Sequence, residues 1–371
     1  MPGEALRRSH TMPGEALRRS HTMPGEALRR SHTMPGEALR RSHTMPGEAL
    51  RRRFLLTLAL AAPFLPLRSA SLDAWESFKR QHQRAYTPEQ ESFRRQVFLY
   101  NLDIIERHNA EHDAGRSTYR LGVNQFADLT NSEFRLLLLT EARSTPAVSD
   151  HAGPHYARTN RTQPDHFDWR DQGVPIPIKD QGAMGAAWAI HVTTAVESGL
   201  IIAGEAALAL SQHNLTDCVA FHSFTPTAVA LDRVHRYGMA SEADYPASRP
   251  CPADLPMAAT ADHVHTVPAG DATALLDGVL QNPVPVTLDA GHISFQLYAG
   301  GIYSERHCSQ TQYDHVMLAA GYGAEGGNQF WLLANSWGTM WGEAGFMKMK
   351  RGVNMCGVAS NAVFPTGVHT L

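Results

Sequence analysis

The polar and apolar positions of residues 91–109 repeat with the spacing of an α-helix. Successive members of the pattern lie four, three, three, four and four residues apart, which places their side chains on one helical face. They are Glu91, Arg95, Phe98, Asn101, Ile105 and Asn109. Taken alone, the pattern predicts an amphipathic helix that packs against a neighbouring surface.

Two further patterns predict secondary structure downstream. Residues 186–203 form a largely apolar run that ends at Gly204, which predicts a buried helix. After about Pro268 the chain changes to short β-rich runs separated by turns, at residues 284–288, 301–303, 316–318 and 330–333. These runs predict a second half that is rich in strands.

The N-terminal region is repetitive. An 11-residue unit that begins Met-Pro-Gly occurs four times in residues 1–44 and starts again at Met45. Because every copy contains proline and glycine, a continuous helix is excluded, and we expect a disordered or non-native extension. Residues 45–71 have the organisation of a secretory signal peptide: three arginines, an apolar stretch over 54–67 that is too short to span a membrane, and small residues at 69–71.

Composition narrows the classes of function. The 371 residues carry a formal net charge of -3, so we expect no nucleic-acid partner, and no nucleotide-binding loop is present. The 20 histidines lack tight ligand spacing, so we expect neither metal nor cofactor. Four cysteines suit an oxidising compartment, and the residues alone allow three pairings. Asn160 and Asn214 begin glycosylation acceptor triplets.

Residues 181–188, Gln-Gly-Ala-Met-Gly-Ala-Ala-Trp, resemble the active-site segment of papain-like cysteine proteases of the cathepsin L type. In that family a cysteine stands where this chain has Ala187. The family's cysteine is deprotonated at the N-terminus of a helix, and its thiolate attacks the acyl carbon. An alanine methyl offers no lone pair, and loss of a nucleophile from a comparable triad costs on the order of 10⁶ in turnover.

Three further segments extend the resemblance over roughly residues 74–366. Asp314-His315-Val316 resembles the segment of the general base, and Asn335-Ser336-Trp337-Gly338 resembles the segment whose asparagine orients that base. The resemblance therefore implies an oxyanion-hole amide at Gln181, a base at His315, an orienting amide at Asn335, and supporting roles for Trp337 and Trp341. It also implies the disulfides Cys218–Cys251 and Cys308–Cys356. A third bridge that the family usually has, from the position of Met184, is missing.

The helical pattern of residues 91–109 is the signature of cathepsin L-like inhibitory prosegments, and residues 122–128, Gly-Val-Asn-Gln-Phe-Ala-Asp, match a second motif of those prosegments. The resemblance implies a prosegment over 72–140, a linker over 141–164 and a papain-like domain over 165–371. The implied fold is α+β and two-lobed, with a helical left lobe around a central helix and an antiparallel β-barrel right lobe, preceded by the helical inhibitory prodomain.

Three functions follow as hypotheses. The first is a catalytically inactive papain-like protein that binds peptides or proteins in its cleft. The second is a regulator whose prosegment inhibits active cathepsins, and the third is a cysteine-type endopeptidase with only residual proteolysis that involves His315. In each case we expect a monomer in the secretory pathway, either extracellular or lysosomal, with no membrane span.

Overall fold

The computed structural model describes residues 64–139, 143–144, 154–159, 162–182, 185–219, 226–247 and 250–371. The predicted repeats at 1–44 and most of the predicted signal peptide lie outside the described residues. The first described helix, α2, runs from Phe64 to Gln81, so the predicted end of the signal peptide at residue 71 falls inside this helix. No helix in the described part of the chain is both long and apolar enough to cross a bilayer.

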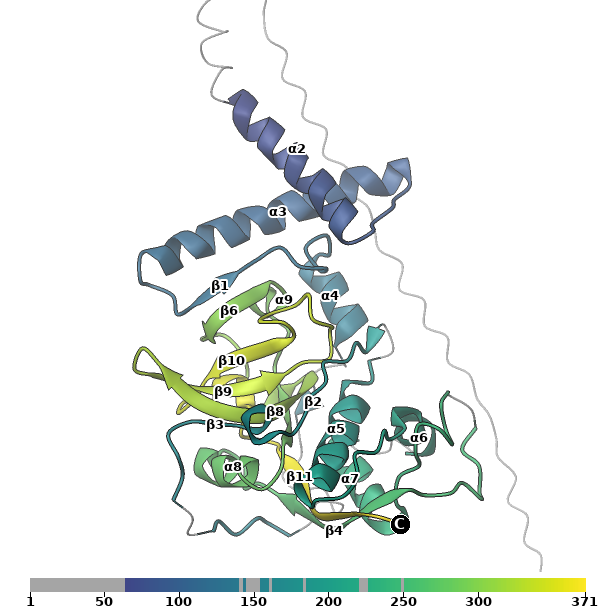
Figure 1. The fold of residues 1–371 in the computed structure, drawn as a ribbon. Helices are drawn as coiled ribbons and strands as arrows, with labels where there is room; N and C mark the ends of the chain where they lie inside the picture. Colours follow the sequence, from purple (N-terminus) through teal and green to yellow (C-terminus); the bar gives the residue numbers. More distant parts are fainter. Residues whose placement is uncertain are drawn as a thin grey trace, which may run out of the picture. The chain divides into compact units, whose positions relative to one another are not determined.

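Helices α2 and α3 (Pro88–Asp113) form a pair that is followed by β1 (Tyr119–Leu121) and α4 (Asn131–Leu138), as Figure 1 shows. α3 begins with a capping box in which the Thr87 side chain and the Gln90 side chain bond each other's backbone N–H. Five of the six side chains on the predicted face make contacts with the rest of the chain. Phe98, Asn101 and Ile105 are buried, and Glu91 and Asn109 make hydrogen bonds. Arg95 is exposed. The helix and its face are therefore as the spacing predicts, except at Arg95.

Polar side chains tie this unit together and to the rest of the chain. Asn109 Nδ2 donates to the Leu121 carbonyl at 2.9 Å, and its Oδ1 accepts from the Leu121 N–H at 3.0 Å. Asn124 Nδ2 donates to the Gln296 carbonyl at 2.8 Å. A Cβ at Gly122 would lie 2.9 Å from the Ala299 Cβ, so a glycine is needed where the backbones approach.

A mixed sheet forms the strand-rich half of the molecule. Its order is β1-β6-β10-β9-β8-β3, with β5 paired to β8. The strands are β3 (Phe167–Asp168), β5 (Val284–Leu288), β6 (Tyr298–Tyr303), β8 (His315–Glu325), β9 (Asn328–Ala334) and β10 (Phe346–Lys350). All four predicted strand runs lie in these strands. The β6–β10 pair is parallel, unlike the others in this sheet, because the chain passes through β8 and β9 before it returns beside β6.

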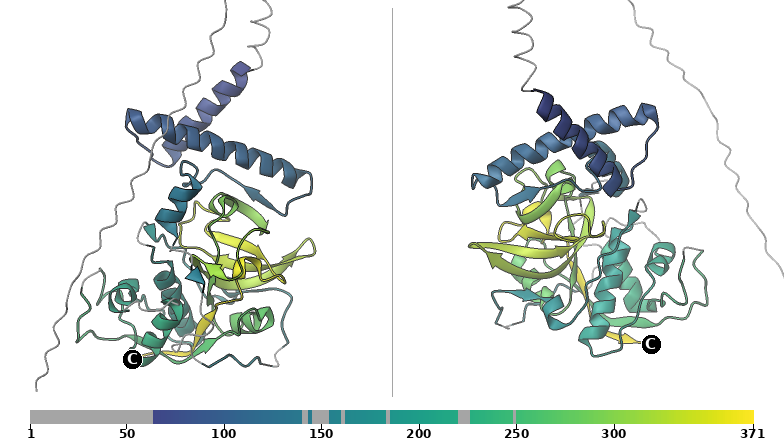
Figure 2. Two further views of the ribbon diagram at one scale, coloured as in Figure 1. Left: turned by 180° about the vertical axis from the view of Figure 1, so that it is seen from behind. Right: turned by 45° about the horizontal axis from the view of Figure 1, so that its top comes forward.

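The helical lobe is built around α5 (Ala187–Ile202), which confirms the predicted helix over 186–203. Gly204 follows it with a left-handed φ of 81°. Around α5 pack α6 (Gln212–Cys218), α7 (Pro226–Tyr237) and the two-stranded ribbon of β4 (Ala259–Thr266) and β11 (Val363–Thr370). Figure 2 shows these elements on one side of the sheet, and β8 contacts α5 directly.

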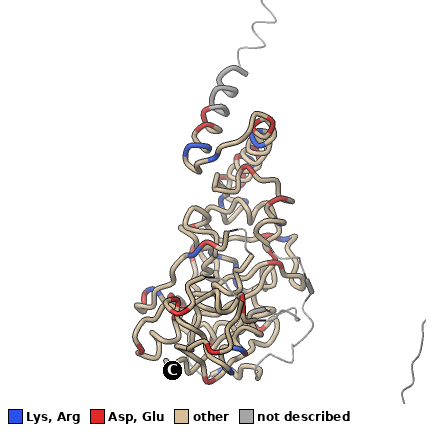
Figure 3. Tube along the Cα trace, turned by 90° about the vertical axis from the view of Figure 1, so that its right-hand side faces the viewer, with Lys and Arg blue, Asp and Glu red and all other residues tan. Residues whose placement is uncertain are grey.

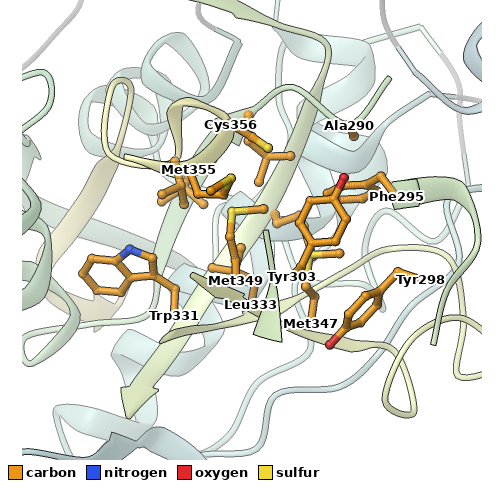
Figure 4. Packing of buried hydrophobic residues seen from close by; sticks show 14 of the residues in the cluster. Ala290, Phe295, Tyr298, Tyr303, Trp331, Leu333, Met347, Met349, Met355 and Cys356 are labelled. Atoms are coloured by element: carbon orange, nitrogen blue, oxygen red, sulfur yellow. The ribbon is translucent and has the colours of Figure 1, made fainter. Parts of the chain in front are cut away.

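Aromatic and sulfur-containing side chains fill the largest core. Figure 4 shows Phe295, Tyr303, Trp331, Met347 and Met349 packed together, and all are fully or nearly fully buried. The remaining short elements are η1 (Trp169–Gln172), α8 (Ala272–Val279), α9 (Ile293–Gln296), β7 (Gln312–Tyr313) and η3 (Met355–Gly357). Buried residues of α2, α3 and α4 belong to the same cluster. The N-terminal helices therefore share one apolar core with the sheet.

The two disulfides join Cys218 to Cys251 and Cys308 to Cys356, with Cα–Cα distances of 5.1 and 4.9 Å. These are the pairs that the family resemblance implies.

The predicted glycosylation site at Asn214 is wrong for the folded chain. Asn214 lies in α6 with 0% exposure, and its Oδ1 accepts from the Ala240 N–H, so its amide is not accessible to a glycan. Asn160 lies outside the described residues.

Parts of the predicted linker over 141–164 are packed against the rest of the chain. β2 (Arg143–Ser144) pairs with β7. Tyr156 is buried, its hydroxyl donates to Asp277 Oδ2 at 2.9 Å, and Thr159 donates its N–H and its hydroxyl to the same carboxyl group. Residues 154–159 therefore belong to the folded body. Acidic and basic side chains are interspersed along the described chain (Figure 3).

Candidate active site

His315 and Asn335 form a hydrogen-bonded pair inside the sheet. His315 is the first residue of β8, and Asn335 directly follows β9, the antiparallel neighbour of β8. The His315 Nε2 and the Asn335 Oδ1 are 2.8 Å apart. Since the amide oxygen is an acceptor, Nε2 carries the hydrogen and Nδ1 holds the lone pair of the neutral ring. The pair therefore presents Nδ1 as a base.

Tryptophans enclose the imidazole. Trp337 stacks on the His315 ring at a centroid distance of 4.6 Å, and Trp341 meets Trp337 edge-on at 5.1 Å. Trp341 Nε1 donates to the Phe295 carbonyl, which fixes the second ring. Burial lowers the pKa of His315 to about 4, and the hydrogen bond with Asn335 opposes this shift. His315 is thus neutral over the neutral and mildly acidic range.

The side-chain amide of Gln181 is held in one orientation. The backbone N–H of Gln181 donates to the Ser336 carbonyl at 2.8 Å, and its Oε1 accepts from the Ser336 hydroxyl at 2.6 Å. The remaining group, Nε2, donates to the backbone carbonyl of Leu138 at 2.8 Å. Leu138 is the last residue of α4. The Gln181 side-chain amide therefore donates a hydrogen bond to a backbone carbonyl oxygen of α4.

Ala187 opens α5. The N-cap residue, Ala186, makes no side-chain hydrogen bond, and Ala187 is 4% exposed. Ala187 and Val316, the neighbour of His315, belong to one buried cluster. The start of α5, with its partial positive charge, therefore shares a buried cluster with the neighbour of His315, and Ala187 contributes a methyl group to that cluster. The neighbouring Met184 lies outside the described residues.

His191 is a second buried histidine in this region. It lies one helical turn after Ala187, is 2% exposed, and its Nε2 has no hydrogen-bond partner within the described chain. Burial lowers the pKa of His191 to about 3, with smaller contributions from His315 and Lys179. Sequence spacing places His191 near the site but carries no signal that the imidazole is buried beside a second histidine.

The arrangement can accept a proton and donate hydrogen bonds to an acyl oxygen. His315 supplies the base, Gln181 supplies the donor, and Asn335 holds the imidazole. Ala187 supplies no reactive atom. Within the described residues no three His, Cys, Asp or Glu side chains gather as a metal site would require.

Comparison with known protein families decides the relationship. The model of the papain family cysteine protease domain matches residues 163–366, and the model of the cathepsin propeptide inhibitor domain (I29) matches residues 75–134. This chain belongs to the papain family of cysteine proteases. The papain-like α+β fold and the inhibitory prosegment that the sequence predicts are thereby confirmed. We call the upstream unit, α2 to α4, the prosegment from here on.

Relatives of this papain-family protein are digestive cysteine proteinases and cathepsins by name. It is 35% identical to digestive cysteine proteinase 1 of Homarus americanus, over 84% of this chain and 98% of the relative. It is also 35% identical to cathepsin 7 of Mus musculus, over 84% and 96%. The structure of digestive procathepsin L2 from the larval midgut of Tenebrio molitor matches with a TM-score of 0.73 at 32% identity, over 80% of this chain and 99% of that one.

Proposed function

We propose that this papain-family protein is a non-catalytic member that binds peptide or protein chains in its cleft. The observation that carries the proposal is Ala187, the first residue of α5, in the position that the family resemblance gives to the nucleophile. A methyl group cannot form the acyl intermediate of cysteine-protease chemistry. His191 is no substitute, because this residue of α5 is 2% exposed and its imidazole is not accessible to a substrate.

Binding without turnover is supported by the groups that remain. The Gln181 Nε2 donates to a peptide carbonyl, that of Leu138, at 2.8 Å. His315, Asn335 and Trp337 keep their mutual contacts. Side chains that hold a peptide backbone act through hydrogen bonds and shape, and neither requires the thiol.

Hydrolysis of a fluorogenic dipeptide at acid pH tests the absence of catalysis. The chain is cut in the linker by an added protease, and its turnover is compared with that of Ala187→Cys and of Ala187→Ser. We expect no turnover from the natural chain, because what survives loss of a nucleophile is roughly 10³ to 10⁴ over water. We expect activity from Ala187→Cys and little from Ala187→Ser, in which the hydroxyl fills similar space but is a weak nucleophile.

The outcomes separate the hypotheses. Turnover by the natural chain that resists thiol-directed inhibitors would favour residual proteolysis that involves His315 and would contradict a non-catalytic role. Silence of both the natural chain and Ala187→Cys would mean that the cleft itself no longer accepts the dipeptide, and that result would count against peptide binding as well.

A second candidate is inhibition of active papain-family proteases by the prosegment. The observation that favours it is an aromatic cluster within the prosegment itself. The Trp75 ring lies 5.6 Å from Phe78 and 5.3 Å from Phe98, and Phe78 and Phe98 are 4.9 Å apart. Nanomolar inhibition of an active cathepsin by residues 72–140 alone, lost in Asn101→Ala, would support this role.

The two disulfides support passage of the chain through the secretory pathway.

A further inference from the structure

A cavity lies beside α7 in the helical lobe, apart from the candidate active site. Its volume is about 610 Å³, which is within the range of small-molecule sites. The residues that line it belong to the end of α6, to α7 and to the loop 250–257. Of the described residues around it, none comes from the prosegment, and α7 lies at the far end of the body from α3 (Figure 1). The prosegment therefore leaves this cavity, which we call the α7 pocket, uncovered.

The α7 pocket has a basic wall and an apolar wall. The residues that α7 contributes are spaced so that they share one face of the helix. They are Val229, Asp232, Arg233, Arg236 and Tyr237. The apolar wall continues across the end of α6 and the loop with Val219, Pro252, Leu255 and Met257. One ligand can therefore contact charged and apolar side chains at once.

The two walls are fixed relative to each other. Cys218 at the end of α6 forms a disulfide with Cys251 in the loop, with a Cα–Cα distance of 5.1 Å. Met257, near the other end of the loop, packs closely on the residue after α7, because a Cβ at Gly238 would lie 2.9 Å from the Met257 Cβ. The α7 pocket is therefore largely preformed, which lowers the entropic cost of binding.

Arg233 brings to this pocket a positive charge that no carboxylate in the described part of the chain balances within ion-pair distance. The acid on the same wall, Asp232, bonds Arg236 instead, with 2.9 Å between Oδ1 and Nε. Burial lowers the pKa of Arg233, and the group that opposes this shift is Tyr237 and not a carboxylate. The Arg233 guanidinium carbon lies 5.7 Å from the centroid of the Tyr237 ring.

The end of α7 accounts for part of the position of Arg233. Its Nη1 donates to the Gly238 carbonyl at 3.1 Å, just beyond the last residue of α7, where the helix favours a positive charge. This bond uses one N–H group and a neutral acceptor. The guanidinium therefore retains donors, and an uncompensated charge, for an acceptor that enters the pocket.

We propose that the α7 pocket binds a small organic molecule with one carboxylate and an apolar body. The carboxylate bonds Arg233, because a planar guanidinium matches the two oxygens of a carboxylate. The apolar body lies against Leu255 and Met257. The volume and the two fixed walls favour a small molecule over a protein surface, since stable protein interfaces extend over a much larger area.

Isothermal titration calorimetry of the full chain at pH 7 tests this site, with 4-phenylbutyrate as the probe and 4-phenylbutyramide as its uncharged match. We expect the carboxylate to bind at least about tenfold more tightly than the amide, because hydrogen bonds to an ionised acceptor are roughly twice as strong as neutral ones. Arg233→Gln should abolish this preference. Arg107→Gln should keep it, because it removes the same charge from an exposed pair with Asp103 in α3.

Leu255→Trp provides a second test that leaves Arg233 in place. Its larger side chain fills the apolar wall, so both probes should bind at least about tenfold more weakly, and this variant decides the matter where Arg233→Gln does not fold. Unchanged binding by Leu255→Trp would contradict the placement of the ligand.

Three other results would overturn the proposal. They are equal binding of the two probes by the natural chain, binding of neither probe at millimolar concentration, and a preference for the carboxylate that survives in folded Arg233→Gln. Since the α7 pocket lies apart from the cleft, none of these results bears on peptide binding there.

Discussion

At the scale of single residues, the site depends on side chains whose partners are backbone groups or amides. Gln181 is oriented by Ser336, and His315 by Asn335, so neither orientation depends on the residue at position 187. This explains how the geometry persists with Ala187 at the start of α5. It also implies that a single substitution there changes chemistry and charge without a rearrangement of the pocket.

The buried histidine His191 should make the folded chain sensitive to acid. Its pKa is about 3 in the folded chain against 6.5 for the free side chain, so the unfolded chain binds the additional proton. Its contribution to stability is complete above pH 6.5 and is lost as the pH falls toward its folded value. Between pH 6.5 and 4 the loss is roughly 3 kcal/mol. We expect His191→Gln to reduce the fall in the free energy of unfolding between pH 7 and pH 4 by that amount, measured by urea denaturation.

A control and an opposing group sharpen this measurement. Asp314 has its pKa raised to about 6, mainly by burial, so its contribution is complete below pH 4 and is lost as the pH rises through 6. Because Asp314 is present in both proteins, its effect cancels in the comparison. His263→Gln, which replaces an exposed histidine, is the matched substitution control. An identical pH dependence for His191→Gln and the natural chain would refute the assignment.

At the scale of elements, the spacing of apolar residues predicts the helices and strands, but it does not predict the contacts between distant segments of the chain. The face of α3, the apolar α5 and the four strand runs follow from spacing and composition. The burial of Asn214, the parallel β6–β10 pair and the His191 Nε2 without a hydrogen-bond partner among the described residues depend on which distant segments meet, and no local pattern records that. The site residues could be named from motifs, whereas the bond from Gln181 to Leu138 could not.

The segment 154–159, within the predicted linker, makes contacts with the papain-like domain that its composition does not record. Tyr156 packs edge-on against Phe364 at 5.0 Å and donates to the fully buried Asp277. We expect Tyr156→Phe to lower the free energy of unfolding by about 1 to 3 kcal/mol, because a buried carboxyl group loses a donor. Urea denaturation of the full chain measures this.

Tyr100→Phe is the matched control, because Tyr100 is 64% exposed and its hydroxyl reaches solvent. Its substitution should change stability by less than about 0.5 kcal/mol. Equal effects of the two substitutions would show that the Tyr156 hydroxyl does not anchor this segment.

A processing cut before Pro154 would leave residues 154–159 on the papain-like domain, with their three hydrogen bonds to Asp277. A cut near Asp165 would place these residues on the prosegment piece, so the bonds would be lost when that piece dissociates.

At the scale of the whole molecule, the prosegment and the papain-like domain are joined by one sheet and one apolar core. β1 of the prosegment pairs with β6 in an antiparallel ladder, and Gln125 Nε2 donates to the Trp337 carbonyl at 2.7 Å. If the chain is non-catalytic, as we propose, it does not cut itself free, and this interface then decides how long the prosegment stays bound to Gln181. Its strength is therefore the quantity that controls access to the site.

Phe134 on α4 is the residue expected to dominate that strength. It is fully buried, and its ring meets Trp337 edge-on at 5.3 Å and Phe126 at 5.6 Å. Truncation of a buried phenylalanine costs about 3 kcal/mol or more, which corresponds to an at least about 100-fold weaker hold on the prosegment. In a chain cut between residues 144 and 154, Phe134→Ala should release the prosegment piece at a dilution where the natural chain keeps it, as followed by size-exclusion chromatography.

Leu136→Ala, on the same helix but 84% exposed, should retain the piece as the natural chain does. Release at the same dilution from the Phe134 and Leu136 variants would show that the aromatic contact to Trp337 does not hold the prosegment over the cleft.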